Sequence, residues 1–246
     1  MKEYRADLHI HTVLSPCGDL EMSPENILAA ARNKNIDILG ITDHNHTGNA
    51  LLVREMAEEY QILVLPGAEV TTREEVHCLA FFPSGETLVR FQKFLEERII
   101  RIPNRPELLG YQILLERGEK VVDEVEYYLG SSVDASIEEV ADAVHLLEGI
   151  FIPAHIDRQK NSLYSQLGFL PAGLTFDALE VSWRAKLEDF LASHPEVKGE
   201  RIVRSSDAHY MSDIGRITTV FLLGEPTCKE VWMAFRGENG RKIIAA

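Results

Sequence analysis

Apolar and polar positions alternate in blocks along the chain, and this pattern predicts an α/β fold. Several apolar blocks of strand length contain almost no polar residue, which is typical of strands buried on both faces of a parallel sheet. We expect strands at residues 5–11, 36–42, 62–70, 76–82, 149–154, 178–182, 201–206 and 217–223.

Amphipathic segments lie between these strands and predict helices. Ser23 followed by Pro24 has the form of an N-cap and a first helical residue, and opens a helix that runs to about Lys34. Residues 47–60 show a similar pattern, and residues 136–148 begin with a capping box of Ser136 and Glu139. A last helix is expected at residues 227–235.

The segment 84–148 interrupts the alternation of strands and helices. It has helical periodicity and no convincing strand, and Pro103 and Pro106 break it. A simple crossover between strands needs far fewer residues. We therefore expect one domain over residues 1–246, in which residues 84–148 form a mainly helical insertion or a lid over the site.

Composition and charge narrow the expected cellular compartment and the expected class of binding partner. No stretch approaches the roughly 18 apolar residues of a membrane span, and the first residues show no secretion signal. The three cysteines, Cys17, Cys78 and Cys228, are odd in number and widely spaced, which favours a cytoplasmic protein. The net charge of −14 disfavours extended binding to nucleic acid, but it allows a small anionic substrate. The oligomeric state stays open.

Histidines and carboxylates gather where the expected strands end. His9 and His11 are two residues apart, so their side chains point to the same face of a strand, and Asp207 and His209 repeat this spacing. Because functional groups collect at the carboxyl ends of strands in α/β proteins, these residues should converge. A single histidine after a strand is more often a hydrogen-bonded core residue, but the joint pattern predicts a site for several metal ions.

Residues beside these positions allow more than one role. Asp43 could orient the imidazole of His44 or cap the helix that begins near Thr47, and the sequence leaves both open. Cys17 and Cys78 flank the ligand segments, where a buried small apolar side chain is the commoner role of an unpaired cysteine.

The ordered motifs resemble those of the PHP (polymerase and histidinol phosphatase) family. The resemblance covers about residues 5–225, and the segment 84–148 is matched weakly or not at all. It rests on H-x-H-T with a downstream Asp, T-D-H, a strand-ending Glu, two later histidines and D-x-H. In this chain the motifs are Asp7-Leu8-His9-Ile10-His11-Thr12, Asp19, Thr42-Asp43-His44, Gly67-Ala68-Glu69, Glu75-Val76-His77, Pro153-Ala154-His155 and Ser206-Asp207-Ala208-His209.

The resemblance implies a distorted (β/α)7 barrel with two to three divalent metal ions at its C-terminal face. The ligands it implies for the first ion are His9, His11, Glu69 and Asp207. Those for the second ion are Glu69, His77 and His155, and those for the third are Asp19, His44 and His209. Mn, Fe and Zn are the candidate metals, and a carboxylate at Asp19, where some members have His, favours the harder ones.

The resemblance also implies a metal-dependent phosphoesterase. The expected substrate is a small phosphorylated compound, either a phosphomonoester or a nucleotide or short-oligonucleotide phosphodiester, attacked by a metal-bridging hydroxide. We expect Glu69, Asp207 and His209 to be catalytic. Arg158, three residues after His155, could bind the substrate phosphate.

Other interpretations remain. Arg158 could instead pair with Asp157 or Glu180 as surface charge. The same metal centre could hydrolyse an amide or carboxylic ester, or the chain could be a non-catalytic, metal-stabilised PHP-type binding module. All nine ligand positions are filled, which argues against the binding module. A proofreading exonuclease is disfavoured by the acidic composition.

Overall fold

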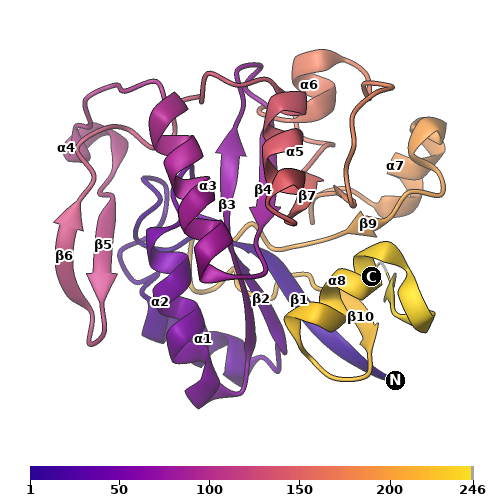
Figure 1. Cartoon of the computed structure of the whole chain (residues 1–246), viewed down its shortest axis with the longest axis horizontal. Helices are drawn as coiled ribbons and strands as arrows, with labels where there is room; N and C mark the ends of the chain where they lie inside the picture. The colour runs from indigo at the N-terminus through magenta and orange to yellow at the C-terminus, as the bar shows by residue number, and fades with distance from the viewer. Residues whose placement is uncertain (245–246) are drawn as a thin grey trace.

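The computed structural model describes residues 1–244 as a mixed α/β fold built on a curled seven-stranded sheet (Figure 1). The predicted fold class, a distorted (β/α)7 barrel, is thereby confirmed. The order across the sheet is β11-β10-β1-β2-β3-β4-β7. These strands are β1 (Lys2–Ile10), β2 (Ile38–Ile41), β3 (Leu63–Thr71), β4 (His77–Phe81), β7 (Ile150–Pro153), β10 (Thr219–Leu223) and β11 (Lys242–Ile244).

The sheet mixes parallel and antiparallel pairs. Strands β1, β2 and β3 are parallel neighbours, whereas β4 runs antiparallel to both β3 and β7. The short strands β8 (Leu179–Glu180) and β9 (Ile202–Val203) form a separate parallel pair. A parallel bridge between Ile10 and Ala208 brings the segment after β9 beside the end of β1. The ends of β1, β3, β7 and β9 therefore meet around one place.

The eight expected strands are all present, and the helices lie between them. Ser23 caps α1 and the Ser136–Glu139 capping box opens α5, as the sequence predicts. The α-helices are α1 (Pro24–Asn33), α2 (Gly48–Met56), α3 (Gly85–Arg98), α4 (Pro106–Leu109), α5 (Ile137–Leu146), α6 (Leu163–Leu167), α7 (Leu187–Ser193) and α8 (Cys228–Arg236). Short 3-10 turns cover Ala57–Tyr60, Pro195–Val197 and Glu238–Gly240.

Apolar side chains pack on both faces of the sheet, which explains the continuous apolar runs. On β2, Ile38 packs in a cluster with Phe81 and Phe221, whereas Leu39 packs in another with Leu28 of α1 and Val53 of α2. All six side chains are buried. Consecutive residues of one strand thus pack in two separate cores, and the strand has little freedom to shift its register.

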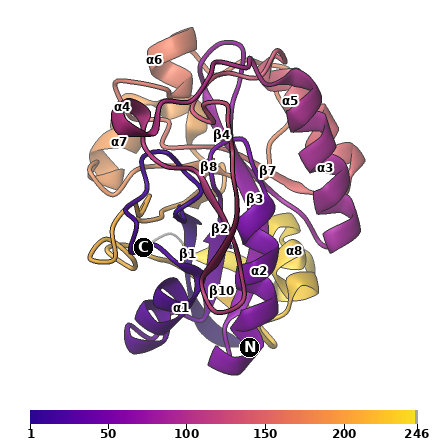
Figure 2. The same cartoon turned by 90° about the vertical axis from the view of Figure 1, so that its left-hand side faces the viewer.

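The segment 84–148 contains α3, α4 and α5, and it also contains a hairpin of β5 (Ile113–Glu116) and β6 (Lys120–Glu124). The expectation of no strand here was wrong. Val121 and Val122 of β6 are exposed, so the strand has no buried face that would give a readable alternation. Figure 2 shows α3 and α5 together on one flank. The role of this segment as a lid stays a prediction.

No helix among residues 1–244 has both the length and the apolar character needed to cross a bilayer.

Candidate metal centre

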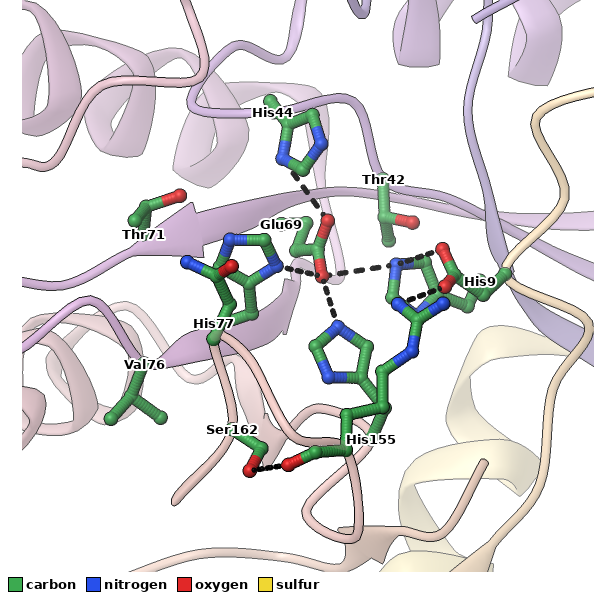
Figure 3. A network of polar contacts seen from close by, with 12 residues as sticks. His9, Thr42, His44, Glu69, Thr71, Val76, His77, His155 and Ser162 are labelled. Carbon is green, nitrogen blue, oxygen red and sulfur yellow. Dashed lines mark hydrogen bonds and ion pairs between the residues drawn. The ribbon is translucent and has the colours of Figure 1, made fainter. Parts of the chain in front are cut away.

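The predicted ligands meet around the carboxylate of Glu69, which lies on β3 and is buried (Figure 3). Its Oε1 atom is 2.9 Å from Nδ1 of His77, the first residue of β4. The same oxygen is 3.1 Å from Nε2 of His155, which follows β7, and 3.3 Å from Nε2 of His9 on β1. Three separate strands thus bring imidazoles to one oxygen atom.

The second oxygen of Glu69 faces two more histidines. Its Oε2 atom is 3.1 Å from Nδ1 of His44 and 3.4 Å from Nε2 of His11. Burial would raise the pKa of Glu69, but His77, His9 and His44 hold it well below its ordinary value. Glu69 is therefore an ionised carboxylate shared among five imidazoles, which is the arrangement predicted for a bridging ligand.

Asp207 joins this cluster from the loop after β9. Its Oδ1 atom lies 3.5 Å from Nε2 of both His9 and His11, and its Oδ2 atom lies 2.6 Å from the guanidinium Nη1 of Arg158. Burial would raise the pKa of Asp207, but His9 and His11 hold it well below its ordinary value. Arg158 pairs with this predicted ligand, and neither Asp157 nor Glu180 is its partner.

Glu180, at the end of β8, orients two of the histidines. Its Oε2 atom accepts a hydrogen bond from Nδ1 of His9 at 3.0 Å and from the backbone N–H of His155 at 2.9 Å. Its side chain is buried, and His9 lowers its pKa against the opposing effect of burial. This role was not expected from the sequence, although Glu180 is a carboxylate within an expected strand, 178–182, just as Glu69 lies within the expected strand 62–70.

Asp43 acts on His11 through Ser15, which corrects both roles expected for it. The Ser15 hydroxyl donates to Asp43 Oδ1 at 2.7 Å and lies 2.9 Å from Nδ1 of His11. Asp43 also accepts from the backbone N–H and hydroxyl of Thr12, at 2.7 and 2.8 Å. It neither contacts the His44 ring nor caps α2.

The nitrogens left over by these hydrogen bonds fit divalent metal ions. Nε2 of His9, Nε2 of His11 and Nδ1 of His44 are buried and have no hydrogen-bond partner among residues 1–244. Burial, helped by His209, lowers the pKa of His11 to about 4, so its ring is neutral. Neutral imidazole nitrogens around a carboxylate are the ligand set of Zn²⁺, Fe²⁺ and Mn²⁺. Burying such nitrogens unpaired is costly unless an ion binds them.

The loop after β1 differs from the sequence prediction. His11, His44 and His209 form a group with Cys17, in which one potential ligand atom of each lies within 4.8 Å of the others. Asp19, the predicted ligand of this loop, is in no such group among residues 1–244. Cys17 was expected to be a buried apolar residue, but it is exposed. Cys78 is buried, as expected.

Two of the predicted ligands have unusual backbone conformations. His155 and Asp207 have positive φ angles of 29° and 51°. Residues other than glycine rarely adopt this left-handed region, and each one that does lowers the stability of the folded state by on the order of 1–3 kcal/mol. His155 lies two residues after the end of β7, and Asp207 lies in the loop after β9, beside the bridge between Ala208 and Ile10. The backbone therefore turns where each ligand faces the cluster.

A pocket of about 580 Å³ opens beside His77 and His155. Its rim carries the cationic side chains of Arg158, Lys160 and Arg184. Asp157 holds one wall in place, because it accepts hydrogen bonds from the backbone N–H and the hydroxyl of Ser182. A chain of net negative charge therefore presents positive charge where its cluster meets solvent.

A curled α/β sheet with a buried histidine and carboxylate cluster at its strand ends is the arrangement of a metal-dependent hydrolase. The family model of the PHP domain matches residues 7–159, and the chain belongs to this family. The enzyme class predicted from the sequence is thus confirmed as the class of the family.

Similar proteins extend this result. The uncharacterized protein YqxK of Bacillus subtilis is 26% identical over 280 residues, which cover the whole chain and 65% of YqxK. The lesion-specific endonuclease Q of Pyrococcus furiosus has the same fold, with a TM-score of 0.73 and 21% identity over 98% of this chain and 58% of that one. A protein of Bifidobacterium adolescentis, provisionally assigned as a metal-dependent phosphoesterase, has a TM-score of 0.57 at 20% identity and matches 84% of this chain and 88% of its own.

One sequence expectation is overturned by these comparisons, namely that the chain does not bind extended nucleic acid. Endonuclease Q is also known in complex with a 27-mer duplex that has an abasic lesion at the active site. This structure matches with a TM-score of 0.69 and 22% identity, and the match covers 98% of this chain and 58% of that one. The expectation rested on the summed charge of the chain. That sum says nothing about the cationic rim formed by Arg158, Lys160 and Arg184.

Proposed function

We propose that the protein is a phosphoesterase that uses two to three divalent metal ions at the Glu69 cluster. The observation that supports this proposal is the ionised, buried carboxylate of Glu69, which lies between five imidazoles. Four of these imidazoles have a buried nitrogen without a hydrogen-bond partner among residues 1–244. Ions held there would supply a nucleophilic water at neutral pH and positive charge against phosphoryl oxygens. Mn, Fe and Zn all suit this set of ligands.

The chain's own residues have distinct roles in this proposal. His9, His11, Glu69, Asp207, His77 and His155 hold the ions of the strand ends, and Glu180 fixes the ring of His9. Arg158 reaches from the pocket rim to the cluster, so its guanidinium can bind a phosphoryl oxygen of the substrate. Water adds to phosphorus, the P–O ester bond breaks, and the departing oxygen takes up a proton.

The pocket favours a phosphodiester of a nucleotide or a nucleic acid over a lone phosphomonoester. A phosphomonoester presents one phosphoryl group, whereas the cationic side chains of Arg158, Lys160 and Arg184 are distributed around a pocket of about 580 Å³. Further phosphates of a polynucleotide would pair with the two cations that the reacting phosphate leaves free. Endonuclease Q, of similar fold, is described as acting on lesion-containing DNA, which supports the same substrate class here.

The test is hydrolysis by purified protein reconstituted with Mn²⁺, with His155→Ala as the matched inactive variant. The substrates are p-nitrophenyl phosphate, bis-p-nitrophenyl phosphate, a short single strand, and a duplex with and without an abasic site. We expect turnover of at least one phosphodiester and its loss in the variant. Hydrolysis of an amide or carboxylic ester with no phosphate ester cleaved would overturn the proposal in favour of an amidohydrolase.

A further inference from the structure

Cys17 lies where the loop after β1 meets the histidines of the loops after β2 and β9. One potential ligand atom from each of Cys17, His11, His44 and His209 lies within 4.8 Å of the others. The rings of His11 and His209 stack with centroids 4.2 Å apart, and His11 and His44 are 4.7 Å apart. A thiol among three imidazoles is a set of soft and intermediate ligands without a carboxylate.

Asp19 is engaged elsewhere. Its Oδ1 atom accepts a hydrogen bond from the backbone N–H of Glu21 at 2.8 Å. Its own backbone N–H donates to the carbonyl oxygen of His209 at 2.9 Å. Asp19 therefore shapes the turn and ties it to the loop after β9, while its carboxylate is turned back onto its own chain.

The loop that holds Cys17 is fixed on both sides. Gly18 N–H donates to Ser15 O at 2.9 Å, and a Cβ atom on Gly18 would lie only 2.4 Å from Thr12 O. Gly110, with φ of +97°, packs so closely on Pro16 that a Cβ atom there would lie 1.8 Å from the Pro16 carbonyl oxygen. The position of the thiol next to the histidines is thus set by the fold.

A second observation also points to a ligand at this place. His11 has its Nε2 directed at Glu69 and Asp207 and so belongs to the neighbouring ion. Nδ1 of His44, one of the ligands of the loop site, is buried without a hydrogen-bond partner among residues 1–244. His209 Nδ1 lies 2.9 Å from the carbonyl oxygen of Asp207, which leaves its Nε2 for an ion.

We propose that Cys17, in place of Asp19, is the loop ligand of a divalent ion bound with His44 and His209 beside His11. The inference rests on the proposed metal centre and specifies one of its ions. Thiolate with imidazole selects Zn²⁺ or Fe²⁺ over Mn²⁺ and Mg²⁺, which prefer oxygen. The thiol releases its proton to solvent on binding, so uptake of this ion frees one proton more than an all-histidine site would.

Cobalt absorption tests the thiolate bond directly. The metal-free full-length protein is titrated with Co²⁺ alone, and the near-ultraviolet sulfur-to-cobalt charge-transfer band is recorded. We expect the band in the wild type, in Cys228→Ser and in Asp19→Asn, and its complete loss in Cys17→Ser. Cys228 begins α8, outside the cluster, and so serves as the matched cysteine control.

Metal counting completes the test. Bound Zn²⁺ after dialysis should fall by one ion per chain in Cys17→Ser, and the circular dichroism spectrum should stay that of the wild type. If Cys17→Ser does not fold, Cys17→Asp replaces it. This variant should bind the ion without the band, and its preference for Zn²⁺ over Mn²⁺ should be smaller than that of the wild type. A band that survives in Cys17→Ser or Cys17→Asp, or that is absent in the wild type, would overturn the inference.

The outcome is separable from the proposed function. Ester hydrolysis without a cobalt–sulfur band would leave the phosphoesterase in place and exclude Cys17 as a ligand. A cobalt–sulfur band without hydrolysis of any ester would establish the ligand and remove the proposed activity.

Discussion

The cluster has two halves that are built differently. Glu69, His9 and His77 lie within strands and are held by the ladder hydrogen bonds of the sheet. Cys17 and His209 lie in loops, and their positions depend on contacts between those loops. The strand half is buried and its geometry follows from strand periodicity, whereas the loop half borders solvent. Ligand geometry is therefore most robust where the sheet itself supplies it.

Removal of the shared carboxylate should have the largest effect, because it breaks the strand half. We expect Glu69→Gln to lower kcat/KM by on the order of 10³-fold or more, since the bridging charge is lost while the size of the side chain is kept. Bound metal should fall in the same variant. Steady-state kinetics and metal analysis measure both. Glu58→Gln, an exposed carboxylate on the 3-10 turn after α2, is the control and should match the wild type; an active Glu69→Gln would rule out a bridging role.

Glu180→Gln tests whether the strand half also depends on its hydrogen-bonded support. Glu180 contacts His9 and the backbone of His155 but is not itself a predicted ligand. Loss of such a partner typically weakens metal affinity by about 10–100-fold. Competition of the protein with a chelator of known affinity measures the change. Unaltered affinity, with the variant folded, would show that the sheet alone orients His9.

Arg158→Ala tests a loop residue that joins the two halves through Asp207. We expect kcat/KM to fall by about 10-fold, equivalent to about 1.4 kcal/mol, because one charge-assisted hydrogen bond to the phosphoryl group is lost. Arg158→Lys should recover only part of this, because it cannot form a bidentate contact. Arg90→Ala, on the exposed side of α3, controls for net charge. If Arg158→Ala loses metal without a change in KM, the arginine orients Asp207 and does not bind substrate.

The smallest effect on the metal centre should come from removing an ion pair that lies away from both halves of the cluster. Glu230 on α8 pairs with Arg241 at 2.7 Å, and this hydrogen bond lowers the pKa of Glu230 from 4.5 to about 2. A lowered pKa stabilises the folded state above pH 4.5, and this contribution is lost as the pH falls toward 2. Glu230→Gln should therefore lower Tm at pH 7 and approach the wild type as the pH falls below about 4.5.

Thermal unfolding between pH 7 and pH 3.5 measures the difference between the two proteins. Metal affinity at pH 7 should be unchanged in Glu230→Gln. A Tm difference that widens toward low pH would contradict the assigned pair.

The sequence placed the strand half and also His44, Asp207 and His209 of the loops in the cluster, but it did not place Cys17 there. His9, Glu69 and His155 follow from residue period and from the position of strand ends, which are local properties. The choice between Cys17 and Asp19 depends on how the turn is tied to His209 and packed against Gly110, a residue more than ninety positions away. The local pattern of polar and apolar residues cannot predict such a long-range contact.

Two further differences have the same origin. The hairpin β5–β6 has an exposed strand, so burial left no pattern in its sequence. Binding to extended nucleic acid was disfavoured because of the total charge, although electrostatic attraction depends on where the charges lie. In the first case the local residue pattern did not reveal a strand, and in the second the total charge did not reveal where the cationic side chains lie.

The left-handed backbone at His155 and Asp207 has a consequence for engineering this protein. Glycine at either position would relieve the conformational cost, so a screen that rewards only thermal stability should enrich it. A screen for turnover should reject the same change, because the ligand is lost with the side chain. At these two positions, selection for thermal stability and selection for catalytic activity therefore favour different residues. A library of stabilised variants should keep His155 and Asp207 unchanged.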